Sequence, residues 1–245
     1  MKRFSYRKLS RENRLTYDVL DYYLELSKKE SDYLLYEEPM GTVSGVQTQI
    51  PVLLSEYQFQ SKEDVDAYLE LMKTTPDYFN SLIAFEQKKA QKGLFMASYT
   101  ADTVIEQCQA FIDMGDSNYL ISTFVDRIQK LTDLSESEKS DYIQKNAYML
   151  QTYVLPAYQQ LIKTVVELKD SGKNEEGLCY LPNGKEYYEL TVQASTGSAR
   201  TVPQLQKLTK NQMKDDLAAM KAVIGLTAEQ AKETAVMDLP IQKKY

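Results

Sequence analysis

The chain of 245 residues contains no histidine, and this absence removes several kinds of active site. A Ser-His-Asp triad needs an imidazole as its general base, so that triad is impossible here. Zinc sites in proteins are built largely from histidine and cysteine, and cysteine is scarce too. We predict that this chain holds no metal ion or other cofactor and carries no catalytic residue of its own. An all-carboxylate magnesium or calcium site is the alternative that these two absences leave open.

The chain has only two cysteines, Cys108 and Cys179, and they do not form a disulfide framework. Cys108 lies in an apolar series with helical spacing, which favours a small buried side chain. Cys179 lies in an irregular stretch and lacks the neighbouring base that a nucleophilic thiol needs. Neither cysteine is therefore predicted to be catalytic.

Long apolar runs and a basic surface are also lacking. No window approaches the roughly 18 apolar residues of a membrane span, so we predict none. The net charge of −6 and a pI near 5.0 argue against binding to a nucleic-acid backbone. No apolar segment follows the basic start, so the chain as given is expected in the cytoplasm. An extracellular or lipoprotein location is the alternative if the true N-terminus is missing.

The acidic pairs do not have the spacing of a cation-binding loop. Glu37-Glu38, Glu175-Glu176 and Asp215-Asp216 lack the ligand pattern of an EF-hand and are interpreted as solvated helix or loop faces. No Walker loop and no strand-Gly-x-Gly-x-x-Gly-helix unit is present, so nucleotide chemistry has no support.

What the sequence does contain is helical periodicity over most of its length, which predicts a mainly α fold with one multi-helix domain over residues 1–245. Capping boxes at Ser61–Asp64 and Ser135–Glu138 mark two helix starts, and Pro156 predicts a kink or break near Val154. Further helix starts are indicated by Ser10, by Thr75-Pro76, and by Thr201 and Thr227 with a glutamine three residues on. In the first helix, the side chains that share one face are Leu15, Val19, Tyr22, Tyr23 and Leu26.

Residues 177–201, GLCYLPNGKEYYELTVQASTGSART, interrupt this pattern. Glycines punctuate the segment, and Pro182-Asn183-Gly184 is a turn signal. The spacing of its apolar residues does not distinguish a helical turn from a strand, so we expect an irregular segment or a short β-hairpin joining 178–180 to 186–188.

Nineteen tyrosines and no tryptophan make the phenol the main aromatic group of the chain. Most tyrosines fall on apolar helix stripes and are interpreted as core. Tyr187, Tyr188 and Arg200 instead lie in the irregular segment, where binding residues tend to concentrate. We predict that these three bind substrate, through phenol hydroxyls and a guanidinium that suit peptide carbonyls and a terminal carboxylate. The alternative is that the tyrosine pair only anchors the segment by packing.

Several segments together resemble the N-terminal half of the bacterial domain-of-unknown-function 885 family. They are LTYDVLDYYLEL, EEPMGTVSGVQTQIPVLLSEYQFQSKEDVDAYLELMKTTPDYF, KGLFMASYTADTVIEQCQAFI, LISTFVDRI, LPAYQQLI and GKEYYELTVQASTG. The resemblance covers most of the chain and rests on the order and spacing of many segments. One departure is Gln204-Leu205-Gln206, where members often carry a Glu-Ile-His-like sequence.

The resemblance implies a function for complete members of the family. They are longer, mostly helical proteins with a His-Glu-x-x-Pro-Gly-His element in the C-terminal half, similar to a zinc-metallopeptidase helix. Nothing in this chain matches that element. We therefore expect the helical N-terminal portion of a zinc-dependent, peptidase-like hydrolase, inactive by itself, with zinc and a peptide-like substrate implied only for complete relatives.

Two partner hypotheses follow from that expectation. The chain would bind the missing C-terminal catalytic half, or would self-associate through the surface that this half would cover. We expect that surface around the kinked helix, Tyr187-Tyr188 and residues 204–223. The alternative is a stand-alone helical binding or scaffold module. The adjacent coding sequence would distinguish the two, because only the first predicts a downstream His-Glu-x-x-Pro-Gly-His segment.

Overall fold

The computed structural model describes residues 5–174 and 177–224. Its α-helices are α1 (Arg11–Glu30), α2 (Val46–Glu56), α3 (Lys62–Lys73), α4 (Thr75–Gln91), α5 (Ser98–Asp113), α6 (Tyr119–Ile128), α7 (Glu136–Met149), α8 (Leu155–Leu168), α9 (Gly184–Thr196) and α10 (Val202–Ile224). Short 3₁₀ turns are η1 (Tyr6–Lys8), η2 (Ser31–Tyr36), η3 (Gly115–Ser117) and η5 (Leu178–Tyr180), and η4 (Leu150–Val154) is a π-helix. The prediction of a mainly α fold is confirmed.

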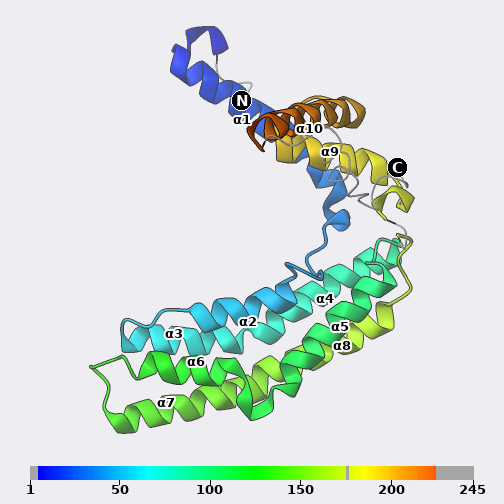
Figure 1. The fold of residues 1–245 in the computed structure, drawn as a ribbon. Coiled ribbons are helices and arrows are strands. Elements are labelled where there is room, and N and C mark those ends of the chain that lie inside the picture. The colour runs from blue at the N-terminus through cyan, green and yellow to red at the C-terminus, as the bar shows by residue number, and fades with distance from the viewer. Residues whose placement is uncertain (1–4, 175–176, 225–245) are drawn as a thin grey trace. The chain divides into compact units, whose positions relative to one another are not determined.

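Contacts divide the chain into two compact units, Met1–Tyr188 and Glu189–Tyr245. The boundary falls within α9. In the first unit, α2 to α8 form a helical bundle in which α8 packs against both α4 and α5, α2 packs against α6, and α3 packs against α7 (Figure 1).

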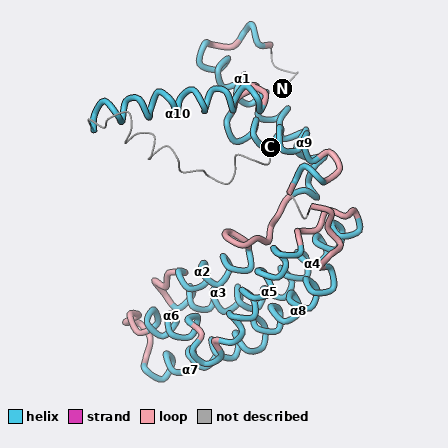
Figure 2. The backbone as a smooth tube through the Cα atoms, turned by 45° about the vertical axis from the view of Figure 1, so that its right-hand side comes forward, coloured by secondary structure: helices cyan, strands magenta, loops and turns pink. Residues whose placement is uncertain are grey.

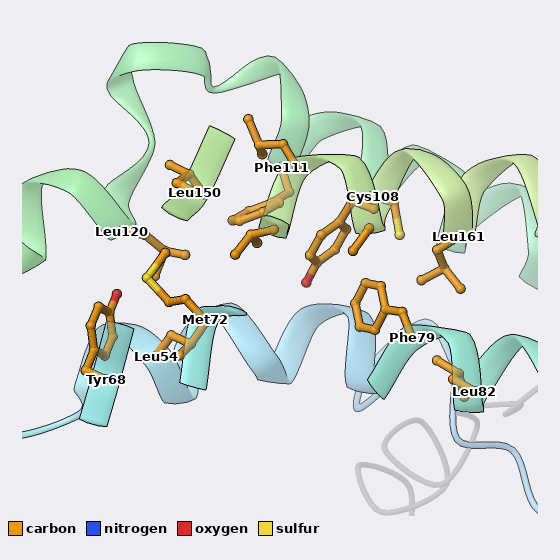
Figure 3. Close-up of a cluster of buried hydrophobic side chains, with 14 of the residues drawn as sticks. Leu54, Tyr68, Met72, Phe79, Leu82, Cys108, Phe111, Leu120, Leu150 and Leu161 are labelled. Carbon is orange, nitrogen blue, oxygen red and sulfur yellow. The ribbon is translucent and has the colours of Figure 1, made fainter. Parts of the chain in front are cut away.

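The core lies between the α2–α4 helices and the α5–α8 helices (Figure 3). Its largest fully buried side chains include Tyr68, Phe79, Phe124 and Tyr158. The Tyr158 hydroxyl donates to the carbonyl of Gln47 at 2.6 Å, so this buried phenol is satisfied by the first turn of α2. Cys108 is buried in the same cluster, as its apolar spacing predicted.

Local capping signals set several of the helix starts. Both predicted capping boxes form, at Ser61–Asp64 before α3 and at Ser135–Glu138 before α7. The Ser10 hydroxyl caps α1 by accepting from the Asn13 amide at 3.2 Å. The Thr201 amide donates to the Gln204 side chain at 2.9 Å before α10. The helix predicted to begin at Thr227 lies outside the described residues.

Pro156 produces a π turn where a kink or break was expected. Residues 150–154 form the π-helix η4, and Pro156 then lies in the first turn of α8. In a regular α-helix the proline ring would meet the carbonyl four residues earlier, that of Thr152. The wider turn accommodates the proline while Leu150 and Val154 stay in the core.

The predicted hairpin is wrong, because the described part of the chain contains no strand (Figure 2). Residues 178–180 form the 3₁₀ turn η5, and the Pro-Asn-Gly turn leads directly into α9. Asn183 adopts a positive φ of 54° and its carbonyl accepts from the Tyr187 amide at 3.0 Å. The turn signal therefore marks a helix start, because its carbonyl is satisfied by the next helical turn rather than by a partner strand.

The apolar stripe of α1 is largely exposed. Of its five predicted members only Leu26 is buried, while Leu15 and Tyr23 keep 67% and 61% of their surface exposed. In the second unit, α10 likewise exposes Leu208, Met213, Leu217 and Met220. Stripes of this kind pack against another element in most globular proteins, so these faces lack a covering element among the described residues.

Candidate functional site: a cleft beside a tyrosine cluster

A cluster of three tyrosines joins the first turn of α9 to η2. The rings of Tyr33 and Tyr36 lie 5.5 and 5.1 Å from the ring of Tyr187, and 5.3 Å from each other. The Tyr36 hydroxyl donates a short hydrogen bond to the Pro182 carbonyl. Burial, with Tyr33 and Glu186 nearby, raises the pKa of Tyr36 above its ordinary value, so this phenol stays a hydrogen-bond donor.

A cleft of about 660 Å³ opens next to this cluster. It lies within the first unit, between η2, the second half of α4 and Pro182, and its volume is in the range of ligand-binding pockets. Most of its walls are apolar, with polar groups from two lysines, one aspartate, one serine and Tyr36. The lining residues are Ser31, Asp32, Leu34, Leu35, Tyr36, Phe85, Lys88, Lys92, Leu94 and Pro182.

Two buried charged side chains, Lys89 and Glu86, lie on α4 and form a cluster with Glu38. The side chain of Lys89 is fully buried and its Nζ donates to the Glu37 carbonyl at 2.7 Å. Its ion-pair partners are Glu38 at 3.1 Å and Glu86 at 3.6 Å. Glu86 is 1% exposed, and neither of its carboxylate oxygens accepts a hydrogen bond. Burial raises the pKa of Glu86 to about 7, although Lys89 acts in the opposite direction.

Sequence reasoning missed this cluster. Glu37 and Glu38 are exposed as interpreted, but Glu38, with 41% of its side chain exposed, also forms an ion pair with the buried ammonium of Lys89. The available signal was that Glu86 follows the buried Leu82 and Ile83 by four and three residues, on the core face of α4. Asp215 and Asp216 are exposed as interpreted, and Glu175-Glu176 lies outside the described residues.

The three predicted binding residues have different surroundings. Tyr187 is half-buried and belongs to the tyrosine cluster beside the cleft. Tyr188 is 49% exposed. Arg200 belongs to the second unit and is exposed, with its backbone amide and Nη1 donating to the Ser198 hydroxyl at 3.2 and 3.4 Å. Their role in substrate binding stays a prediction.

The residues of this chain do not fit a zinc site. Histidine is absent from the whole sequence, and residues 5–174 and 177–224 contain no group of three or more cysteine, aspartate or glutamate side chains placed to hold a metal ion. Burial also raises the pKa of the Cys108 thiol to about 12, which disfavours the thiolate that a metal needs.

Gly184 permits the close contact that shapes this region. A Cβ at residue 184 would overlap the carbonyl oxygen of Leu178, so Gly184→Ala should force η5 away from the start of α9. We expect a loss of about 1–3 kcal/mol in the free energy of opening this segment, measured by hydrogen exchange at the Tyr187 amide. Gly41→Ala is the matched control, because a Cβ there meets nothing within 4 Å. Equal exchange in both variants would contradict the argument.

The described residues therefore form an all-helical protein with a partly apolar cleft. The chain belongs to the family of bacterial proteins of unknown function called DUF885, whose family model matches residues 1–240. It is also similar in fold to the solved structure of "the putative lipoprotein from Colwellia psychrerythraea", with a TM-score of 0.68 and 18% sequence identity. That similarity covers 76% of this chain and 31% of the Colwellia chain, so this chain spans about a third of that protein's length.

No curated protein matches the chain. Among the helices of the described residues, none is both long enough and apolar enough to cross a membrane.

Proposed function

We propose that this chain is the helical N-terminal portion of a zinc-dependent, peptidase-like hydrolase, and that it is inactive by itself because the metal ligands lie outside it. The observation that carries the proposal is the combination of family membership over residues 1–240 with a sequence that contains no histidine. A catalytic zinc needs three protein ligands and an open position, which these residues do not supply.

The comparison with the Colwellia structure supports a protein in which the metal-binding part is separate from this helical portion. The chain spans 31% of that protein, which leaves room for a separate metal-binding part. The exposed stripes of α1 and α10 are apolar surfaces that such a part, or a second copy of the chain, would cover. An extracellular or lipoprotein location belongs to this proposal as well, because the Colwellia structure is described as that of a "putative lipoprotein".

In the complete protein, we assign the tyrosine region to the binding of a peptide-like substrate. Tyr187 and Tyr188 offer phenol hydroxyls to peptide carbonyls, and Arg200 offers a guanidinium to a terminal carboxylate. The cleft beside Tyr36 supports this assignment, since it combines apolar walls with a few polar groups.

A metal and activity assay tests the proposal on the purified chain. We expect less than stoichiometric zinc by elemental analysis and no peptide hydrolysis that a chelator abolishes. Zinc bound at one ion per chain, or chelator-sensitive hydrolysis, would contradict it. The neighbouring coding sequence separates the remaining alternative: a His-Glu-x-x-Pro-Gly-His segment there supports the hydrolase, and an unrelated neighbour supports a stand-alone helical binding or scaffold module.

A further inference from the structure

We infer that the cleft between η2, α4 and Pro182 binds a ligand that carries a carboxylate on an apolar body, with Lys88 and Lys92 holding the carboxylate. The apolar body would be the last side chains of a peptide or the acyl chain of a fatty acid. The peptide source rests on the proposed function, whereas the ligand chemistry rests on the cleft alone.

The charge at the cleft is the first reason. Lys88 lies in the last turn of α4, Lys92 is the C-cap residue that follows this helix, and both line the cleft. The side chain of Lys173 packs beside Gly93, the residue between the lining residues Lys92 and Leu94. Among the described residues, none of these three lysines has an ion-pair or hydrogen-bond partner for its ammonium group. A concentration of unpaired cations on a chain of net charge −6 selects an anion.

The walls are the second reason. Leu34, Leu35, Phe85, Leu94 and Pro182 give the cleft an apolar interior, so a small hydrophilic anion would leave most of it unfilled. A volume of about 660 Å³ accommodates two apolar side chains or a medium acyl chain. The ligand therefore needs an apolar body as well as a negative end.

Lys88 and Lys92 also lie near the C-terminus of α4, where cations favour the helix dipole without any ligand. That role accounts for their charge but not for the apolar cavity beside them. Asp32 distinguishes the helix-dipole role of the two lysines from ligand binding. Asp32 lines the same cleft and has no ion-pair partner among the described residues, so its carboxylate would repel a bound carboxylate.

Calorimetric titration of the purified chain tests the inference with three probes: N-acetyl-Phe-Phe, its C-terminal amide, and decanoate. We expect saturable binding of at least one of the two acids, and about tenfold weaker binding of the amide than of the peptide acid if the peptide acid binds. Binding of the peptide acid alone assigns a peptide end, and binding of decanoate alone assigns an acyl chain. No saturable binding by either acid, or equal binding of the peptide acid and its amide with none of decanoate, would overturn the inference.

Variants of the exposed lining residues sharpen the test. Lys88→Gln with Lys92→Gln should weaken binding of the acid about tenfold, while Asp32→Asn should strengthen it about twofold. Lys130→Gln with Lys163→Gln is the matched control, since it changes the net charge equally at residues that do not line the cleft. If the control pair weakens binding as much as the cleft pair, the attraction is unspecific and the inference fails. None of these readouts depends on zinc, so failure here is distinct from failure of the proposed hydrolase function.

Discussion

Replacing Lys89 with methionine is expected to lower the free energy of unfolding by about 3–5 kcal/mol at pH 8. The side chain of Lys89 is fully buried, and its ammonium group forms an ion pair with Glu86. Without it, the Glu86 carboxylate would remain buried with no ion pair and no hydrogen bond. The substitution would also remove the donor to the Glu37 carbonyl, which attaches the segment after η2 to α4.

The loss in this variant should depend on pH in a defined direction. The folded-state pKa of Glu86 is raised from 4.5 to about 7, so the native chain holds a proton that the unfolded chain has already released between these values. Stability contributed by this group is therefore full below about pH 4.5 and is lost as the pH rises through about 7. Because Lys89 lowers the pKa of Glu86, removing it should raise that pKa further and make the variant weakest at high pH.

Urea denaturation of the Lys89→Met variant at pH 5 and pH 8 measures this effect. We expect a clearly smaller loss at pH 5, where protonation neutralises Glu86. Adding Glu86→Gln to the variant should recover part of the loss at pH 8, because no buried charge remains at residue 86. The exposed neighbour Lys88→Met serves as the control and should change stability by no more than about 0.5 kcal/mol. A loss that is the same at both pH values would show that the ion pair with Glu86 is not its cause.

The parts of the fold that sequence predicted are those that depend on neighbouring residues. The capping boxes at Ser61 and Ser135 form because serine and an acidic side chain three residues later satisfy each other's amides in any context. The irregularity at Pro156 is equally local, although the sequence did not distinguish a π turn from a break. Local hydrogen-bond chemistry is thus sufficient to place most helix starts.

The parts that sequence did not predict depend on tertiary contacts. The three-residue spacing of Glu86 and Lys89 does not predict that Lys89 is buried, because the same spacing occurs on solvated helices. The hairpin prediction failed because the Pro-Asn-Gly turn and the mixed periodicity are equally compatible with a strand and with a helix. The contacts of Tyr187 with Tyr33 and Tyr36 involve residues about 150 positions apart in the sequence, so no local pattern indicates them. The cleft was missed for the same reason, since η2, α4 and Pro182 meet only in the folded unit.

Replacing Arg127 with methionine is expected to cost about 3 kcal/mol, because one guanidinium holds the end of α2 against α6. Its Nη1 donates to the carbonyls of Leu54 and Tyr57 at 2.9 and 2.6 Å, and its Nε donates to the Thr123 carbonyl at 2.9 Å. The first two carbonyls belong to the C-terminal end of α2, where no intrahelical donor exists and a cation is favoured.

Arg127→Lys should recover only part of that loss. The guanidinium also stacks over Phe59 and Tyr68, with its central carbon 4.6 and 5.0 Å from the two ring centres. An ammonium can carry the charge but cannot keep the planar stack and reach three carbonyls at fixed angles, so we expect the lysine variant to lose about 1–2 kcal/mol. Arg11→Met, at an exposed position on α1, is the control and should be close to neutral.

Hydrogen exchange distinguishes this capping role from general packing. If Arg127 holds the last turn of α2, the amides of that turn should lose protection in Arg127→Met more than those of α8, which shares the core but not the guanidinium. An equal loss of protection in both helices would indicate that the arginine only fills space between Phe59 and Tyr68. A methionine variant as stable as the Arg11→Met control would exclude both roles, because neither the hydrogen bonds nor the stack would then contribute to the folded state.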